Sequence, residues 1–249
     1  MKIRSFFSFV FILFIMSQSF TKTIEKDSFT ARDGKEITFH FIQHASFFFT
    51  YSGITIYSDP VSYDGIDYKL LPKADVILIT HDHYDHLDKE AIADISTSTT
   101  RIFCNSEVLK ILQKGIDMEN GEIIPFTITL FDIISVNMVV EAVPAYNTTE
   151  GRDIYHPKGR DNGYVVTLGG SRIYISGDCE FMAEMADIRD IDVAFFSINQ
   201  PYTMTVDQAI RAAEVIKPKV LYPIHYSQTN LERLLELSQK GIEVRFYDM

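Results

Sequence analysis

Thr80-His-Asp-His-Tyr-Asp-His86 places three imidazoles and two carboxylates in a single short turn. Groups of these kinds, packed this closely, would repel or protonate one another unless a cation lay between them. Neutral imidazole nitrogen and carboxylate oxygen are the ligands that zinc and similar divalent ions prefer. The stretch therefore predicts a catalytic metal site.

An apolar, β-branched run from Asp75 to Thr80 precedes the turn. The run has the length of a buried strand, so the ligands begin where a strand ends. Side chains two residues apart in an extended chain project to the same side, which predicts that His81 and His83 bind one ion. The following turn directs Asp85 and His86 toward a second ion about 3.5–4 Å from the first.

The turn resembles the His-x-His-x-Asp-His signature of the metallo-β-lactamase superfamily of hydrolases. Three further segments resemble the other motifs of that family in order and separation: Tyr57-Ser-Asp59-Pro60, Ile175-Ser-Gly-Asp178 and Tyr222-Pro-Ile-His225. The resemblance implies an α/β fold of four layers, an αββα sandwich, in which Asp178 bridges two metal ions and His225 binds the second. Gln43-His-Ala-Ser46 looks most like the branch that contains ascorbate-6-phosphate lactonase-like proteins and N-acyl-phosphatidylethanolamine phospholipases.

The residues themselves support the positions of Asp178 and His225. Each follows a short apolar segment, Arg172–Ser176 or Lys219–Tyr222, that reads as a strand. Both side chains should therefore reach one edge of a sheet. Taken alone, such an Asp is usually a turn residue and such a His a half-buried one, so their assignment as ligands depends on the motif above.

The third ligand of the first ion departs from the family pattern. That pattern supplies a His in the loop after a central strand, but here the strand 134–143 leads to Asn147. His156 follows in the polar loop Tyr155-His-Pro-Lys-Gly-Arg160 and either replaces the missing ligand or contacts substrate. Asn147 could also bind weakly through its amide oxygen, which would lower the metal affinity of the first site.

Four more residues are expected around the ligands. Asp59 is expected to orient them through hydrogen bonds, because metal sites need their imidazole tautomers fixed. His44 precedes a strand and faces either the site or the core. Lys158 and Arg160 add positive charge beside His156, where an anionic substrate group could dock; a solvated basic pair is the alternative.

Three helix starts carry recognisable caps. Asp88 reads as the N-cap of a helix that fixes the metal-binding turn from its far side. Thr205-Val-Asp-Gln208 is a capping box that opens a helix to about Ile216. Thr229-Asn-Leu-Glu232 reads as a second capping box, for a helix that ends at Gly241.

The first 19 residues differ from the rest of the chain. Lys2 and Arg4 precede an apolar run, Phe6–Met16, and the small residues of Ser17-Gln-Ser19 suit cleavage. This pattern predicts a secretory signal peptide over residues 1–19 and export to the periplasm or the medium. The run is short for a membrane-spanning helix, so no stable span is expected after cleavage, although an uncleaved anchor stays open.

The remaining residues, 20–249, have the length of one catalytic domain, and 46% of the 249-residue chain is apolar. Without Lys2 and Arg4 this part carries 21 basic against 34 acidic residues, a net charge of −13. Such a chain repels polyanions, so we expect no binding to nucleic acid.

Two cysteines cannot make a disulfide scaffold, although an oxidising compartment would permit one bond. Cys104 ends the expected strand Arg101–Cys104, and Cys179 directly follows Asp178. We expect Cys179 to be structural or sensitive to oxidation, because a metal-activated hydroxide already supplies the nucleophile.

The site predicts a metal-dependent hydrolase. A hydroxide activated by two divalent ions, zinc or else manganese or iron, would attack carbon or phosphorus, and Asp85 would orient it. We rank a phosphoester or phosphodiester first among small-molecule substrates and a lactone or amide second, because this fold hosts many reactions. A mononuclear iron oxygenase and a noncatalytic metal-binding protein are the other classes. Asp85, Asp178 and His225 argue against the last, because storage requires no open coordination position.

Overall fold

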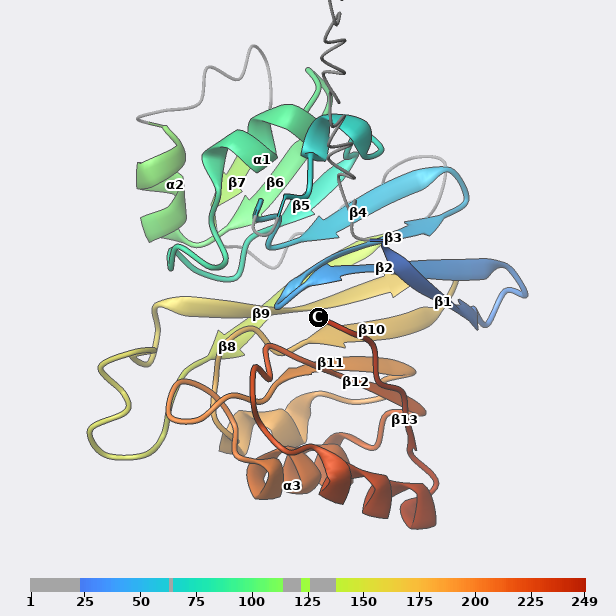
Figure 1. Ribbon diagram of the computed structural model, residues 1–249, viewed down its shortest axis with the longest axis vertical. Helices are drawn as coiled ribbons and strands as arrows, with labels where there is room; N and C mark the ends of the chain where they lie inside the picture. Colours follow the sequence, from blue (N-terminus) through green and yellow to red (C-terminus); the bar gives the residue numbers. More distant parts are fainter. Residues whose placement is uncertain (1–22, 63–64, 114–121, 126–137) are drawn as a thin grey trace, which may run out of the picture.

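The computed structural model describes residues 23–62, 65–113, 122–125 and 138–249. Two mixed β-sheets pack face to face, and helices cover both outer faces (Figure 1). The predicted four-layer αββα sandwich is confirmed. The expected signal peptide, residues 1–19, and the start of the expected strand 134–143 lie outside the described residues.

In the described residues, the first sheet has seven strands, which lie side by side in chain order. They are β1 (Glu25–Thr30), β2 (Glu36–Gln43), β3 (Ser46–Tyr51), β4 (Ile54–Ser58), β5 (Val76–Leu78), β6 (Arg101–Cys104) and β7 (Glu122–Pro125). Strands β1 to β4 are antiparallel, whereas β4 to β7 are parallel. Because β5 runs parallel to both of its neighbours, the loop after it leaves the sheet at the same edge as Asp59, directly after β4.

The second sheet has six strands in the order β13-β12-β11-β10-β9-β8. They are β8 (Val139–Ala145), β9 (Asp161–Leu168), β10 (Ser171–Ile175), β11 (Val193–Ser197), β12 (Val220–Ile224) and β13 (Glu243–Val244). Strands β10, β11 and β12 are parallel. Asp178 and His225 follow β10 and β12, so both lie at one edge of this sheet.

Apolar side chains from both sheets fill the space between them. In β2 the burial alternates, so that Ile37, Phe39 and Phe41 face inward and their polar neighbours Thr38 and His40 are only half-buried. Phe47 of the first sheet stacks on Phe195 of the second, with ring centroids 4.2 Å apart. Each aromatic ring buried in this way contributes about 1.5–3 kcal/mol, which holds the sheets together.

The outer faces are covered by α-helices and 3₁₀-helices. The first sheet is covered by η1 (Tyr68–Leu70), α1 (Lys89–Ile95) and α2 (Ser106–Leu112), and the second by η2 (Ala183–Asp187), α3 (Val206–Ile216) and η3 (Glu232–Lys240). In the described part of the chain, none of these helices combines the length and apolar character needed to cross a bilayer.

Two of the three predicted helix caps are confirmed. The Asp88 side chain accepts hydrogen bonds from the amides of Glu90 and Ala91, and Thr205 forms the capping box with Gln208. The capping box predicted at Thr229 is wrong. The Glu232 amide donates to the Asn230 side chain at 2.9 Å, and the Thr229 amide donates to the Tyr226 carbonyl. Both amides are therefore hydrogen-bonded within turns that precede η3, and Thr229 does not cap the helix.

Gly241 ends η3 as predicted. Its φ of 79° lies in the left-handed region, where a side chain would be strained, and its amide donates to the carbonyls of Leu237 and Ser238.

Candidate metal centre

Loops from both sheets bring their polar side chains to one edge of the sandwich. The loop after β5 supplies four of the predicted ligands, and the turn between β2 and β3 supplies His44. The second sheet supplies the rest from the loops after β8, β10 and β12: His156, Asp178 and His225. Six of the seven histidines therefore meet at this edge.

The first group consists of His81, His83 and His156. One nitrogen of each lies within 4.8 Å of the others. His81 and His156 are buried, whereas His83 is only half-buried. The structure therefore brings His156 to the two histidines that the sequence predicted for the first ion.

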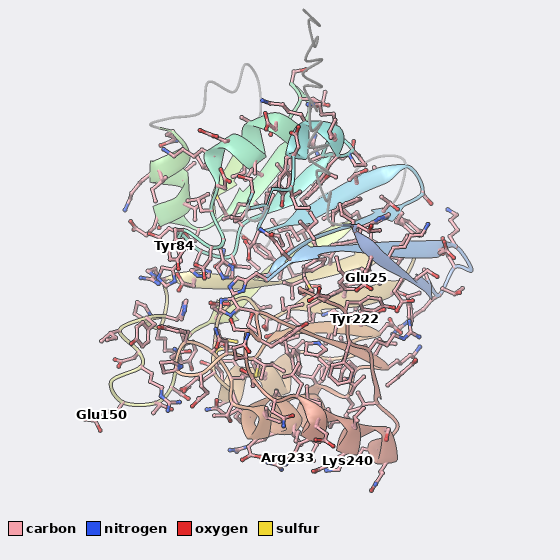
Figure 2. The ribbon with its side chains drawn as sticks, in the orientation of Figure 1. Glu25, Tyr84, Glu150, Tyr222, Arg233 and Lys240 are labelled. Atoms are coloured by element: carbon pink, nitrogen blue, oxygen red, sulfur yellow. The ribbon has the colours of Figure 1, made fainter. Side chains whose placement is uncertain are left out.

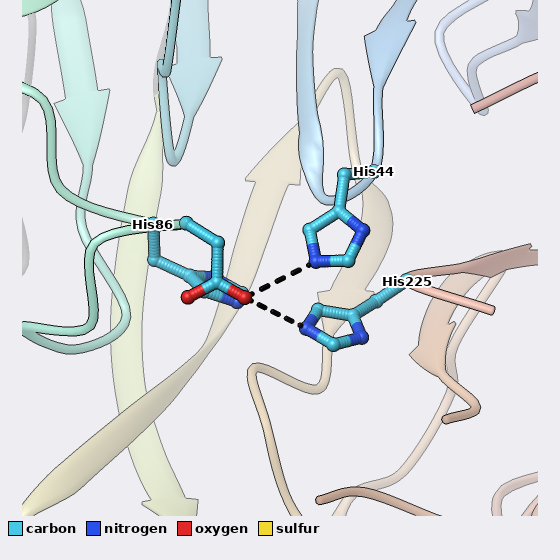
Figure 3. Close-up of side chains that lie close together, drawn as sticks. His44, His86 and His225 are labelled. Carbon is cyan, nitrogen blue, oxygen red and sulfur yellow. Dashed lines mark hydrogen bonds and ion pairs between the residues drawn. The ribbon is translucent and has the colours of Figure 1, made fainter. Parts of the chain in front are cut away.

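The second group consists of Asp85, His86, His225 and His44. His225 Nε2 lies 3.5 Å from Asp85 Oδ2, and His44 Nε2 lies 3.3 Å from the same oxygen. Figure 3 shows the rings of His44 and His225 directed at this carboxylate.

Asp178 lies between the two groups. Its Oδ2 is 3.4 Å from His86 Nε2 and 3.3 Å from His225 Nε2 on one side. On the other side the same oxygen is 3.6 Å from His156 Nε2 and 3.9 Å from His81 Nε2. This is the position that a bridging carboxylate requires.

The distances between these atoms fit a divalent ion. Zinc binds nitrogen and oxygen at about 2.0–2.2 Å, so tetrahedral ligands are about 3.3–3.6 Å apart. Most of the separations around Asp178 and Asp85 fall in that range. Moreover, His81 Nε2, His86 Nε2 and Asp178 Oδ1 are among the buried atoms that have no hydrogen-bond partner in the described residues. An unsatisfied buried polar atom costs about 1–3 kcal/mol, and a cation would satisfy all three.

Hydrogen bonds to the other ring nitrogen fix three of the imidazoles. His86 Nδ1 donates to Asp59 Oδ2 at 2.8 Å, and His156 Nδ1 donates to Asp161 Oδ2 at 3.0 Å. His81 Nδ1 lies 2.9 Å from the hydroxyl of Thr80, which itself donates to Asp59. Each bond leaves Nε2 facing the group, as metal ligation requires.

Asp59 therefore lies where it can orient the ligands, as predicted, whereas the sequence pattern predicted no role for Thr80 or Asp161. The available signal for Asp161 was its place at the start of the strand that follows the His156 loop.

The charges of the site favour a cation. Burial, together with neighbouring His86, holds the pKa of His81 well below its usual range. Burial also opposes charge on His86, but the carboxylates of Asp178 and Asp59 raise its pKa well above the ordinary value. Despite its own burial, the pKa of Asp178 is held well below normal by His225 and His86. The carboxylates are thus ionised and stabilise positive charge between them.

Comparison with known proteins identifies the family. Residues 38–225 match the family profile of the β-lactamase superfamily domain. The chain belongs to the metallo-β-lactamase superfamily. A UPF0173 metal-dependent hydrolase from Archaeoglobus fulgidus is 31% identical over 184 residues, which cover 71% of this chain and 77% of the relative.

Solved structures agree with this membership of the metallo-β-lactamase superfamily. One from Parabacteroides distasonis, provisionally named a metal-dependent hydrolase, is 47% identical with a TM-score of 0.82, covering 91% of this chain and 100% of that chain. A metallo hydrolase from Ignicoccus hospitalis, 24% identical with a TM-score of 0.66, covers 83% and 92% of the two chains and shows the shared fold. The predicted enzyme class, a metal-dependent hydrolase of this fold, is confirmed.

In this metallo-β-lactamase superfamily member, Asn147 closes the base of the loop that carries His156. Its amide N–H donates to the His156 carbonyl at 2.8 Å. Its side chain donates to the carbonyls of Tyr202, at 2.7 Å, and Arg152, at 3.2 Å. Asn147 is thus engaged in holding the loop, and His156 returns nine residues later beside His81.

Glu180 anchors the first residues of the same loop, and the sequence pattern predicted no role for it. Its carboxylate accepts from the amides of Thr148 and Thr149, at 2.8 and 2.6 Å, and from both of their hydroxyls. Arg152 adds a fifth donor at 3.2 Å. Glu180 and Asn147 together determine where the loop places His156.

The two basic residues beside His156 are paired with carboxylates. Lys158 donates to Glu184 at 2.8 Å, and this bond raises its pKa to about 12. Arg160 donates two bonds to Asp161, at 2.7 and 2.8 Å. Neither residue therefore brings a net positive charge to the site.

Both cysteines of this superfamily member are free and buried. Cys104 packs under the helices of the first sheet, and burial raises its thiol pKa to about 12. Cys179 packs under those of the second, and its thiol donates to the Ser176 carbonyl. A protonated, buried thiol is a poor nucleophile, in agreement with the structural role expected for Cys179.

Proposed function

We propose that this chain hydrolyses a phosphoester or phosphodiester with two divalent metal ions, zinc or else manganese or iron. The observation that carries the proposal is the position of Asp178 Oδ2, within 3.3–3.9 Å of imidazoles from both ligand groups. A single oxygen shared in this way is the arrangement that a two-ion hydrolytic site needs.

Each group has its own set of ligands. His81, His83 and His156 would hold the first ion, and Asp85, His86 and His225 the second, with Asp178 shared. When bound, two such ions lower the pKa of water toward about 7 and neutralise charge on the substrate. Two complete groups make a mononuclear iron oxygenase or a storage protein a poorer explanation.

Asp85 is the carboxylate best placed to orient the attacking water. Its side chain is 21% exposed, whereas that of Asp178 is 3% exposed, so Asp85 is the one that reaches solvent. Despite partial burial, the neighbouring imidazoles of His225 and His44 hold the pKa of Asp85 below the usual range, so the carboxylate is ionised and can accept a water proton.

Charge supports an anionic substrate. Two divalent ions outweigh the charges of Asp85 and Asp178, so the loaded site is positive within an otherwise acidic chain of net charge −11. Such a local field attracts a phosphate group and holds it at the metals.

A lactone or amide is the second candidate, and one observation favours it. Lys158 and Arg160 are already paired with Glu184 and Asp161, so no protein cation beside His156 is left for a phosphate. Tyr84, on the ligand loop, is 79% exposed and lies at the outer surface in Figure 2, where it could meet an uncharged substrate. The resemblance of Gln43–Ser46 to the lactonase-like branch supports the same alternative.

Metal content and substrate class can be tested together. Elemental analysis of the purified protein should give two ions per chain, and bis(p-nitrophenyl) phosphate should be hydrolysed faster than p-nitrophenyl phosphate or a homoserine lactone. Preference for the lactone would replace the first candidate with the second. No metal and no turnover would refute both.

The Asp85→Asn variant tests the role of that carboxylate. We expect kcat to fall at least about 100-fold, because general acid–base groups typically contribute that much. Asp82→Asn is the matched control, since Asp82 lies in the same loop but outside the ligand groups. Equal loss in both variants would mean that the loop, and not Asp85, is responsible.

We also propose export of the chain to the periplasm or the medium. The basic start and the apolar run of residues 1–19 support this proposal. N-terminal sequencing of the protein from its native host should find a mature chain that begins near Phe20. An intact Met1 in the cytoplasmic fraction would refute export.

A further inference from the structure

His44 is held rigidly over the second ligand group. It occupies the tight turn between β2 and β3 with a φ of 55°, and His225 has a φ of 50°. The His225 amide donates to the His44 carbonyl at 2.8 Å, and the two ring centroids are 3.7 Å apart. Left-handed backbone costs about 1–2 kcal/mol for such residues, so this bond between the two sheets keeps both imidazoles in place.

The ring of His44 presents Nε2 to the group. That atom is 3.3 Å from Asp85 Oδ2, the oxygen that His225 Nε2 approaches at 3.5 Å. These separations equal those among the other ligand atoms around Asp178, at 3.3–3.6 Å. The ligand atoms of His44, Asp85, His86 and His225 all lie within 4.8 Å of one another.

We infer that His44 is an additional ligand of the second metal ion, so that three imidazoles and two carboxylates surround it. The inference rests on the proposed function, because it requires metal at this site. The motif residues of the second group are Asp85, His86, Asp178 and His225, and His44 lies outside them.

The consequence is an asymmetric pair of ions. The second ion has five protein ligands, whereas the first has three histidines and a share of Asp178. More ligands leave fewer open coordination positions, so the second ion is bound more tightly and the first is more exchangeable and more open to substrate.

Cobalt spectroscopy on the full chain tests the assignment. Ligated imidazoles whose other nitrogen carries a proton give strongly shifted N–H resonances in the NMR spectrum of a Co²⁺ protein. Wild-type protein loaded with two Co²⁺ ions should show six such signals, one of which disappears in His44→Asn. Five signals in the wild type, with none lost in the variant, would overturn the inference.

Affinity gives a second readout. Asn tolerates left-handed backbone, so His44→Asn keeps the turn while removing the ring. We expect the Kd of the tighter Co²⁺ ion to rise about 100-fold in a calorimetric titration and that of the weaker ion to stay unchanged. An unchanged Kd for the tighter ion would overturn the assignment even if the variant folds normally.

His40→Asn is the matched control. His40 lies on β2, the strand that leads into the His44 turn, and its ring stacks on Phe48 at 4.2 Å, outside the ligand groups. It should leave both Co²⁺ affinities unchanged. If wild-type protein binds no Co²⁺, the proposed function fails together with this inference; if it binds two ions and His44→Asn behaves like His40→Asn, only this inference fails.

Discussion

Asp178 and Glu180 are two buried carboxylates that follow the same strand, two residues apart, and their surroundings differ completely. Glu180 accepts five hydrogen bonds from Thr148, Thr149 and Arg152. Asp178 faces imidazoles, and its Oδ1 has no partner among the described residues. A carboxylate saturated by donors holds a loop, whereas one left without donors and surrounded by His Nε2 atoms is available to bind a metal ion.

The direction of the pKa shift alone does not distinguish the role of Asp178 from that of Glu180. Both side chains are ionised against the effect of burial: bonds from Thr149 lower the pKa of Glu180, and His225 and His86 lower that of Asp178. The chemical identity of the neighbours decides the role, because hydroxyl and amide donors complete the carboxylate of Glu180, whereas imidazole Nε2 atoms around Asp178 are groups that can themselves bind a cation.

The sharpest test of this contrast is Asp178→Asn. Loss of the shared oxygen should lower kcat/KM at least about 1,000-fold, equivalent to about 4 kcal/mol of transition-state stabilisation. It should also reduce the metal content below two ions per chain, as measured by elemental analysis. Two retained ions with full turnover would remove Asp178 from the centre.

Glu180→Gln should have a smaller effect of a different kind. The amide group of Gln would face donors, so the loop loosens and His156 is less well placed. We expect about 10-fold weaker binding of the first ion with little change at the second, since orienting groups typically contribute 10–100-fold. Calorimetric titration with Co²⁺ measures both.

Glu150→Gln is the control for that variant. Glu150 is exposed on the same loop and lies at the lower left edge in Figure 2. The Glu150→Gln variant should bind both ions with the affinities of the wild type. A matching loss in both variants would show that loop charge, and not the anchoring by Glu180, sets the affinity.

Asp192 extends the comparison to a site that cannot be confused with metal binding. Its buried carboxylate accepts from the Arg172 amide at 3.0 Å and pairs with Arg32 and Lys219 at 2.9 and 2.8 Å. Because both cations are largely exposed, Asp192→Asn should lower the free energy of unfolding by only about 1–3 kcal/mol and leave turnover unchanged. Chemical denaturation measures the loss.

The pH dependence of that loss has a defined sign. Although burial opposes it, Lys219, the Arg172 amide and Arg32 lower the pKa of Asp192 below its ordinary value of 3.8. The stabilisation is therefore present above about pH 4 and lost as the pH falls through the lowered pKa. The difference between wild type and Asp192→Asn should shrink at pH 3; a constant difference would mean that packing, and not charge, is involved.

The sequence predicted the residues around the candidate metal site well. It predicted poorly the residues that anchor the loops. His81 and His83 lie in one short motif directly after a strand, so local pattern was enough to place them, whereas Asp178 was placed through the resemblance of its segment to a family motif. Glu180 and Asp161 are defined by partners that the fold brings to them, and Glu180 receives bonds from residues 28–32 positions away. No local pattern distinguishes such an acid from an exposed one.

The same limit explains the remaining differences. Lys158 looked like a free charge because Glu184, 26 residues further along, is close only in the folded chain. Arg160 pairs with its chain neighbour Asp161, so that pairing was within reach of prediction. The cap at Thr229 failed because Asn230 competed for the amide of Glu232. His156 was within reach of prediction because few histidines were available, and its place beside His83 depends on the loop anchors.

The ligands come from both halves of the chain, and this has a consequence for folding. Each ion would cross-link the two sheets at one rim of the sandwich, joining His83 to His156 and His86 to His225. Binding energy then becomes folding energy: free metal at 1,000 times its Kd would add about 4.1 kcal/mol to the stability of the native state. The thermal midpoint of this protein would thus depend on its metal supply as much as on its sequence.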